Sequence, residues 1–219
     1  RAFIENPTVP SWVAGCRRRA AHLGYLADEF WLHDPEMDGP RLQRILSTRG
    51  IRGAIVIGAF GVDSIPARYA SLWNDIACVV TGVRTHHPAL SFTCVDHHNL
   101  VLDAMAEVRA LGYQRPGLVL HEGVDCVTDG RFTCSMWLAQ QPIPAPQRIP
   151  SLTKFIDGSA VPDAFRRWVE DHEPDVVLTL HPNVRAWLTK LDCSVPRDVG
   201  LIHLEKIRFT AQWAGMDQH

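Results

Sequence analysis

The chain has 219 residues, of which 46% are hydrophobic and 21% are charged, and its formal net charge at pH 7 is −2. This composition is typical of a globular protein and excludes the disordered, fibrous and membrane classes. The near-neutral charge also argues against a DNA-binding surface within this sequence. No apolar run reaches the ~18 residues of a membrane span, and no signal peptide is visible in the sequence.

The cysteine pattern indicates a reducing compartment. The six cysteines are scattered, form no Cys-x-x-Cys pair, and several fall inside predicted helices or strands. Disulfides are rare in the cytosol, where buried cysteines pack as small apolar residues. We therefore interpret all six as reduced core residues of a cytoplasmic protein, namely Cys16, Cys78, Cys94, Cys126, Cys134 and Cys193.

The first half of the chain alternates between predicted strands and helices. Val101, Met105, Val108 and Leu111 recur at spacings of four and three, which predicts an amphipathic helix, and Gly112 suits its end. The elements expected before it are a strand end at 2–4, a helix at 11–24, a strand at 30–32, a helix at 38–50, a strand at 53–57, a helix at 66–73, and strands at 77–80 and 91–95.

The second half repeats the same alternation. Pro142, Pro144, Pro146 and Pro150 exclude a long helix in its middle and permit at most a short edge strand at 148–149. Repeated helix, turn and apolar strand units predict an α/β fold with two parallel-sheet lobes. The elements expected here are strands at 117–120, 176–180 and 199–204, with helices at 129–140, from Pro162, and at 184–191.

Asp96-His97-His98, directly after a predicted strand, is the cluster in the sequence that most suggests metal binding or catalysis. Carboxylate and imidazole together can bind a divalent metal, and the triplet resembles the signature of DHH-type phosphoesterases. That family needs an Asp-x-Asp pair and further aspartates at strand ends, which this sequence lacks. The triplet is therefore interpreted first as polar strand-end residues that face a cleft, with the metal phosphoesterase kept as an alternative.

Other catalytic signatures are absent from the sequence. It contains neither a Gly-x-Ser-x-Gly elbow nor a glycine-rich phosphate loop, so we expect a protein that is not an enzyme and needs no metal or cofactor. Open parallel sheets bind ligands at the carboxyl ends of their strands. Arg131, His181 and Glu205 fall at such ends or at the helix starts beyond them.

Several segments resemble the effector-binding part of LacI/GalR-family transcriptional regulators, which shares its fold with type I periplasmic sugar-binding proteins. Each segment alone is a weak match, but their order and spacing over nearly the whole chain are specific. The matching segments are Asn6-Pro7 with Leu23-Gly24-Tyr25, residues 45–58, Leu111-Gly112-Tyr113-Gln114-Arg115, Glu173-Pro174-Asp175-Val176-Val177, Val195-Pro196-Arg197-Asp198-Val199 and Ala214-Gly215-Met216-Asp217-Gln218.

The resemblance implies two Rossmann-like lobes joined by a hinge, with a ligand held between them. The N-terminal lobe would span 1–112, the C-terminal lobe 113–205, and a crossover segment toward the first lobe 206–219. As the resemblance implies, Arg131 and Glu205 would hold ligand hydroxyls, although aspartate is usual at position 205. His181-Pro182 falls where the family usually has Asn-Asp in its pocket. Asp96, at a strand end, and Val9 and Pro10, in the first lobe, match further pocket positions.

The family's pattern also implies partners. We expect a small effector, a sugar or related polyol, and a homodimer without membrane contact that binds operator DNA through a helix-turn-helix headpiece preceding residue 1. His203 stands where the family has glycine, which with His181 suggests an unusual ligand. The alternative on the same fold is a periplasmic solute-binding protein of a sugar transporter.

Overall fold

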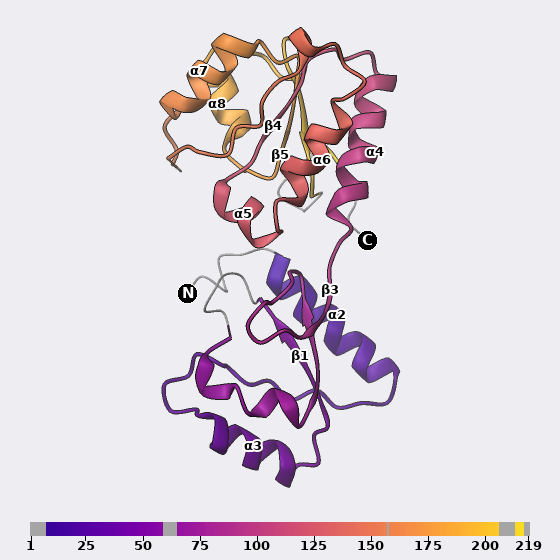
Figure 1. Ribbon diagram of the computed structural model, residues 1–219, viewed down its shortest axis with the longest axis vertical. Coiled ribbons are helices and arrows are strands. Elements are labelled where there is room, and N and C mark those ends of the chain that lie inside the picture. The colour runs from indigo at the N-terminus through magenta and orange to yellow at the C-terminus, as the bar shows by residue number, and fades with distance from the viewer. Residues whose placement is uncertain (1–7, 59–64, 157, 206–212, 217–219) are drawn as a thin grey trace. The chain divides into compact units, whose positions relative to one another are not determined.

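The computed structural model describes residues 8–58, 65–156, 158–205 and 213–216 (Figure 1). The chain divides into two compact units, 1–94 and 95–219, each with its own parallel sheet. Two parallel sheets with helices confirm the predicted α/β fold class. Within the described ranges, no helix is both long and apolar enough to cross a membrane.

The first unit is built on a three-stranded parallel sheet in the order β1-β2-β3. Its core lies between the sheet and α3, where Leu42 and Leu46 meet Val56 and Val80. Asp38 caps α3 by accepting a 2.7 Å bond from the backbone nitrogen of Arg41. The elements are α2 (Thr8–His22), α3 (Gly39–Thr48), β1 (Gly53–Ile57), β2 (Ala77–Thr81), β3 (Ser91–Thr93) and the 3-10 turns η1 (Ala67–Tyr69) and η2 (Leu72–Asn74).

The second unit has a four-stranded parallel sheet in the order β4-β5-β6-β7. Strands β4, β5 and β6 are buried throughout, as expected for a parallel sheet covered on both faces. The strands are β4 (Pro116–Val119), β5 (Val176–Thr179), β6 (Gly200–His203) and β7 (Ala214–Gly215), and the helices are α4 (His97–Ala110), α5 (Glu122–Val127), α6 (Arg131–Ala139), η3 (Ala145–Gln147), α7 (Asp163–His172) and α8 (Val184–Lys190).

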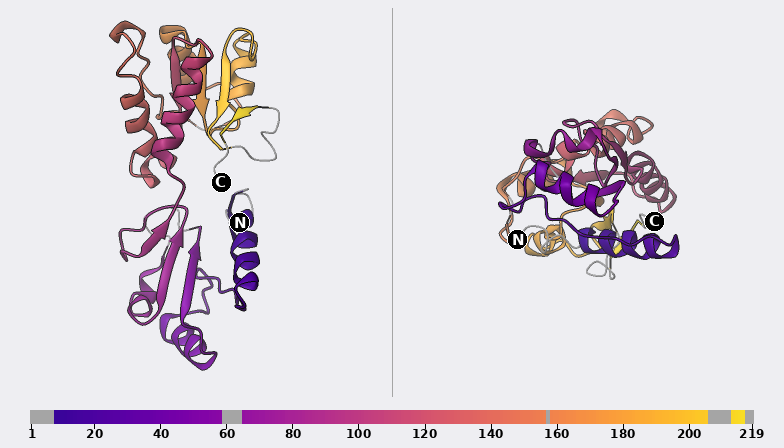
Figure 2. Two further views of the ribbon diagram at one scale, coloured as in Figure 1. Left: turned by 90° about the vertical axis from the view of Figure 1, so that its right-hand side faces the viewer. Right: turned by 90° about the horizontal axis from the view of Figure 1, so that it is seen from below.

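Successive side chains along a strand of this unit pack into two separate cores. Leu118 and Leu178 join the core under α4 and α6, whereas Val119 and Val177 join the core under α7 and α8. Figures 1 and 2 show these two helix pairs on opposite faces of the sheet. The alternation follows from the two-residue period of a strand, and it fixes which face of the sheet each helix pair covers.

Helix α4 belongs to the second unit, whereas we expected it in a first lobe that ended at residue 112. The division falls after Cys94, because the apolar side of α4 packs on α6 and shares its core. The expected crossover at 206–219 is described only at 213–216, where Ala214–Gly215 pairs with β6 and extends the second sheet. Residues 206–212 and 217–219 lie outside the described part.

Three local predictions differ from the structure. Residues 30–32 form no strand, and the guanidinium of Arg68 instead binds the carbonyl oxygen of Leu32 at 2.8 Å. Residues 66–73 form two 3-10 turns in place of one helix. The edge pairing of β4 comes from Leu152, bridged to Val119, and not from residues 148–149. The strand end expected at 2–4 lies outside the described residues.

Candidate functional site

The carboxyl edge of the second sheet carries the polar residues that follow its strands. Val119, Thr179 and His203 lie in register across β4, β5 and β6. His121 and His181 each come two residues past the first two of these, and Glu205 comes two residues past His203. The parallel pairing therefore places His121, His181 and Glu205 at the same edge, as predicted for His181 and Glu205.

His181 is fixed within a cluster of rings. It is buried and stacks on Trp187, with ring centroids 4.5 Å apart. Phe155 stands edge-on to His181 at 5.4 Å and to His121 at 5.6 Å. The Nδ1 atom of His181 accepts a 3.2 Å bond from the backbone nitrogen of Asn183, so in the neutral ring the proton lies on Nε2.

Arg131 is the first residue of α6. Its Nη2 atom lies 3.6 Å from Oδ2 of Asp129, and its side chain is 29% exposed. The helix start is held by Asp125, whose Oδ2 accepts a 2.8 Å bond from the hydroxyl of Thr133. Gly130 precedes the helix at a positive φ of 69°, which glycine adopts at little cost. The guanidinium is therefore presented from an anchored helix terminus.

The three residues of the Asp96-His97-His98 triplet each make a different local contact. Asp96 caps α4 by accepting from the backbone nitrogen of Asn99 at 3.1 Å, and this bond is the main cause of the lowered pKa of its carboxyl. His97 is buried against Phe132, with ring centroids 4.9 Å apart. His98 Nδ1 lies 2.8 Å from the hydroxyl of Ser135. Among the described residues, no group of three or more His, Cys, Asp or Glu side chains could hold a metal ion.

Glu205 follows β6 and is half-buried. Its backbone nitrogen donates to Nδ1 of His203 at 3.2 Å, and the ring of His203 meets Trp213 edge-on at 5.3 Å. Burial lowers the pKa of the His203 imidazole, so this ring favours its neutral form. His203 thereby shapes the backbone that carries the Glu205 carboxylate.

Val9 and Pro10 lie in the first turn of α2, in the first unit. Val9 is 1% exposed, whereas Pro10 is exposed. Proline fits this first turn because it needs no backbone donor there, which also lets the helix begin at Thr8, before the expected start at residue 11. Their contact with a ligand stays a prediction from the resemblance.

Sequence reasoning did not identify Phe155, Trp187 and His121 as site residues, and it singled out His97 only as part of the Asp96-His97-His98 triplet. His121 could have been found, because it directly follows an apolar strand as His181 does. Phe155 could not be identified from the sequence, since its proline-flanked segment has no period that predicts its packing against the strands.

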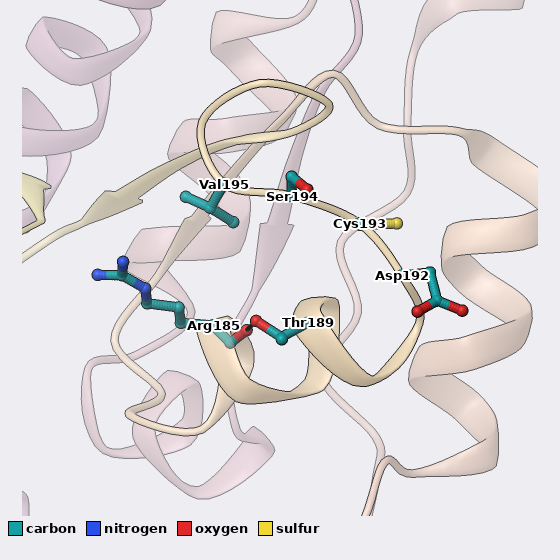
Figure 3. A pocket seen from close by; sticks show the side chains of 6 residues that line it. All are labelled: Arg185, Thr189, Asp192, Cys193, Ser194 and Val195. Carbon is teal, nitrogen blue, oxygen red and sulfur yellow. Dashed lines mark hydrogen bonds between the residues drawn. The ribbon is translucent and has the colours of Figure 1, made fainter.

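Two surface hollows lie away from these residues. The first has a volume of about 390 Å³ and is lined from α8 and the loop after it (Figure 3) by Arg185, Thr189, Asp192, Cys193, Ser194 and Val195. The second, of about 320 Å³, is lined by residues of α6 and of the segment after it, among them Trp137 and Arg148. Neither contains a predicted ligand residue. The candidate site lies at the strand ends, where His121 and His181 both contact Phe155 and Glu205 follows the neighbouring strand.

No protein-family model matches the sequence, and no curated protein matches it. Solved structures of transcriptional regulators do match. A candidate LacI transcriptional regulator from Bacillus cereus subsp. cytotoxis NVH 391-98 is 16% identical, with a TM-score of 0.65 over 100% of this chain and 80% of that one. A LacI transcriptional regulator from a Rhodococcus species is 14% identical, with a TM-score of 0.62 over 94% of this chain and 78% of that one.

A third structure was determined with a ligand. The LacI family transcriptional regulator CCPA from Weissella paramesenteroides, with bound glucose, is 10% identical, with a TM-score of 0.63 over 94% of this chain and 80% of that one. These likenesses establish the fold: the chain has the two-sheet α/β architecture of LacI-family regulators. The resemblance stated from the sequence motifs is therefore confirmed at the level of fold.

Proposed function

We propose that this chain is the effector-binding and dimerisation domain of a LacI-type transcriptional regulator. Its effector would be a small hydroxyl-bearing molecule, a sugar or related polyol. One observation carries the proposal: in a sheet with this fold, His181 and Glu205 share the carboxyl edge, and Arg131 begins a helix of the same unit. The proposed protein is a cytoplasmic homodimer without catalytic activity.

The three side chains offer complementary chemistry to a hydroxyl-rich ligand. The guanidinium of Arg131 and the Nε2 proton of His181 donate, whereas the carboxylate of Glu205 accepts. Charge-assisted bonds of this kind are the stronger ones, so Arg131 and Glu205 would supply most of the polar affinity. Asp96, Val9 and Pro10 are proposed as further contacts, with less support.

Regulation requires that the ligand prefer one conformation of the domain. A ligand with equal affinity for two conformations shifts nothing, however tightly it binds. We propose that effector binding changes the geometry of the dimer and hence the affinity of an attached helix-turn-helix headpiece for its operator.

The proposal is tested by a thermal-shift screen of sugars and polyols, followed by calorimetric titration of each hit. A specific ligand at 100 times its dissociation constant stabilises the folded state by about 2.7 kcal/mol. We expect at least one sugar or polyol to raise the melting temperature saturably. Absence of any saturable shift across hexoses, pentoses and hexitols would contradict the proposed function.

A further inference from the structure

His97 carries a buried polar atom that has no hydrogen-bond partner among the described residues. The residue is 9% exposed, and its Nδ1 atom forms no hydrogen bond within the part of the chain that the structure describes. In native proteins nearly all buried polar atoms are paired, and an exception calls for an explanation such as strain, a functional role, or a bound water or ion. The surroundings of His97 indicate which of these fits.

Two helices begin side by side at His97. It is the first residue of α4, and its ring packs on Phe132, the second residue of α6. Burial, and after it the charge of Arg131, lower the pKa of the His97 imidazole, so Arg131 lies close to it. A bond between His98 and Ser135 ties the same two helices together. Arg131, a predicted ligand residue, thus has an unsatisfied imidazole beside it.

From this juxtaposition we propose that Nδ1 of His97 forms a hydrogen bond with a hydroxyl group of the effector, beside Arg131, and that the effector is an uncharged sugar or polyol. The inference rests on the proposed function and adds a contact residue and the charge of the ligand. A hydroxyl group both donates and accepts, so it satisfies Nδ1 in either neutral tautomer.

The charges around the two helix starts favour an uncharged ligand. The positive charge of Arg131 is already met by Asp129 at 3.6 Å. Asp96 adds a second carboxylate directly before His97, and the hydrogen bond from Asn99 lowers its pKa, which keeps it ionised. A sugar acid would bring a third carboxylate to a place with one guanidinium, and like charges oppose binding.

The test is calorimetric titration of the 219-residue chain with three matched pairs: glucose and glucuronate, galactose and galacturonate, and sorbitol and gluconate. Three variants separate the atoms of His97. His97→Asn places an amide near the position of Nδ1, His97→Gln places one near Nε2, and His97→Phe keeps the ring contact with Phe132 but has no nitrogen. His98→Phe is the matched control on the neighbouring imidazole.

We expect a neutral compound to bind more tightly than its acid. Its dissociation constant should rise about tenfold in His97→Phe and His97→Gln, the equivalent of about 1.4 kcal/mol. It should stay close to that of the unaltered chain in His97→Asn and in His98→Phe. The melting temperature of the free chain should not fall in His97→Phe, because the substitution removes an unsatisfied atom.

Any other outcome contradicts either the hydrogen bond from His97 or the assigned charge of the ligand. Equal weakening by asparagine and phenylalanine would show that His97 acts through packing, and tighter binding of an acid would overturn the assigned charge. Binding of a neutral sugar that depends on Arg131 but is unaffected at His97 would overturn this inference alone. If none of the six compounds binds, this inference fails, and the wider screen of sugars and polyols decides separately on the proposed function.

Discussion

The imidazole of His181 stacks on the indole of Trp187, with an angle of 27° between the ring planes. Trp187 is fully buried on α8, and its indole nitrogen donates to the carbonyl oxygen of Gly158 at 3.3 Å. The same carbonyl accepts a 3.0 Å bond from the side chain of Asn183. Trp187 therefore connects a ligand candidate to the core of the second unit.

Replacing Trp187 by alanine should destabilise the second unit by about 3–5 kcal/mol, because a large buried ring is lost and a cavity remains. Urea unfolding monitored by far-UV circular dichroism measures the change. Trp137→Ala is the matched control, since that indole is 66% exposed and its loss should cost no more than about 0.5 kcal/mol. Similar midpoints for both variants would show that Trp187 is not part of the packed core.

Arg131→Ala and Glu205→Ala should each reduce the stabilisation by the sugar to about half or less, while the free chain still unfolds cooperatively. Both side chains are partly exposed, so their removal leaves no buried cavity. Loss of one charge-assisted bond costs about 1.5–3 kcal/mol, or more than tenfold in affinity. Arg185→Ala, at the hollow beside α8, serves as the control and should bind normally. Undiminished binding in both site variants would refute the assignment.

Asp175→Ala should destabilise the second unit by about 1–3 kcal/mol. The Asp175 carboxylate accepts two bonds, from the backbone nitrogens of Gln114 at 2.6 Å and Arg115 at 2.9 Å, and both donors lose their acceptor. Denaturant midpoints measure the effect. Asp171→Ala, an exposed carboxylate at the end of α7, should leave the midpoint unchanged. The interpretation fails if the two variants cannot be distinguished.

The free energy of unfolding should fall as the pH drops below 6.5. Burial is the first cause of the lowered pKa of both His97 and His203, whose ordinary value is 6.5. Above that pH both rings are neutral in the folded and unfolded chain. Below it the unfolded chain binds protons that the folded chain resists, so stability declines until the folded pKa is reached.

Denaturant titrations across this pH range test the histidine effect. His97→Phe should make the decline shallower, whereas His22→Asn, an exposed histidine of α2, should leave it unchanged. A separate loss is expected at lower pH, because bonds from Arg197 hold the pKa of Asp198 at about 2, below the usual 3.8. An identical slope for His97→Phe and the unaltered chain would contradict the role of burial.

Most of the fold could be predicted from the sequence because the buried strands are apolar except at their carboxyl ends, where Thr179 and His203 stand. Val176, Val177 and Leu178 form an uninterrupted apolar run, which fits a strand covered on both faces. The strand expected at 30–32 is wrong because three residues carry too little pattern, and a distant guanidinium of Arg68 takes the carbonyl that a strand would use. Contacts between segments far apart in sequence decide such places.

The candidate site was predictable only where a polar residue directly follows a strand. His181 and Glu205 met that condition. The unsatisfied nitrogen of His97 could not be found in the sequence, since it depends on Phe132 packing against the ring and on the lack of a hydrogen-bond partner among the described residues. Likewise, nothing in the sequence around Phe155 indicates that it would lie against both His121 and His181.

The Asp175 bonds join two of the segments that resemble LacI/GalR-family regulators. Two segments that resemble the family, Gln114-Arg115 and Pro174-Asp175, are fastened to each other at the end of the sheet where the strands begin. Strand order and parallel pairing put His181 and Glu205 at the opposite end. These matching residues maintain the scaffold, and a lineage could exchange one effector for another while leaving them untouched.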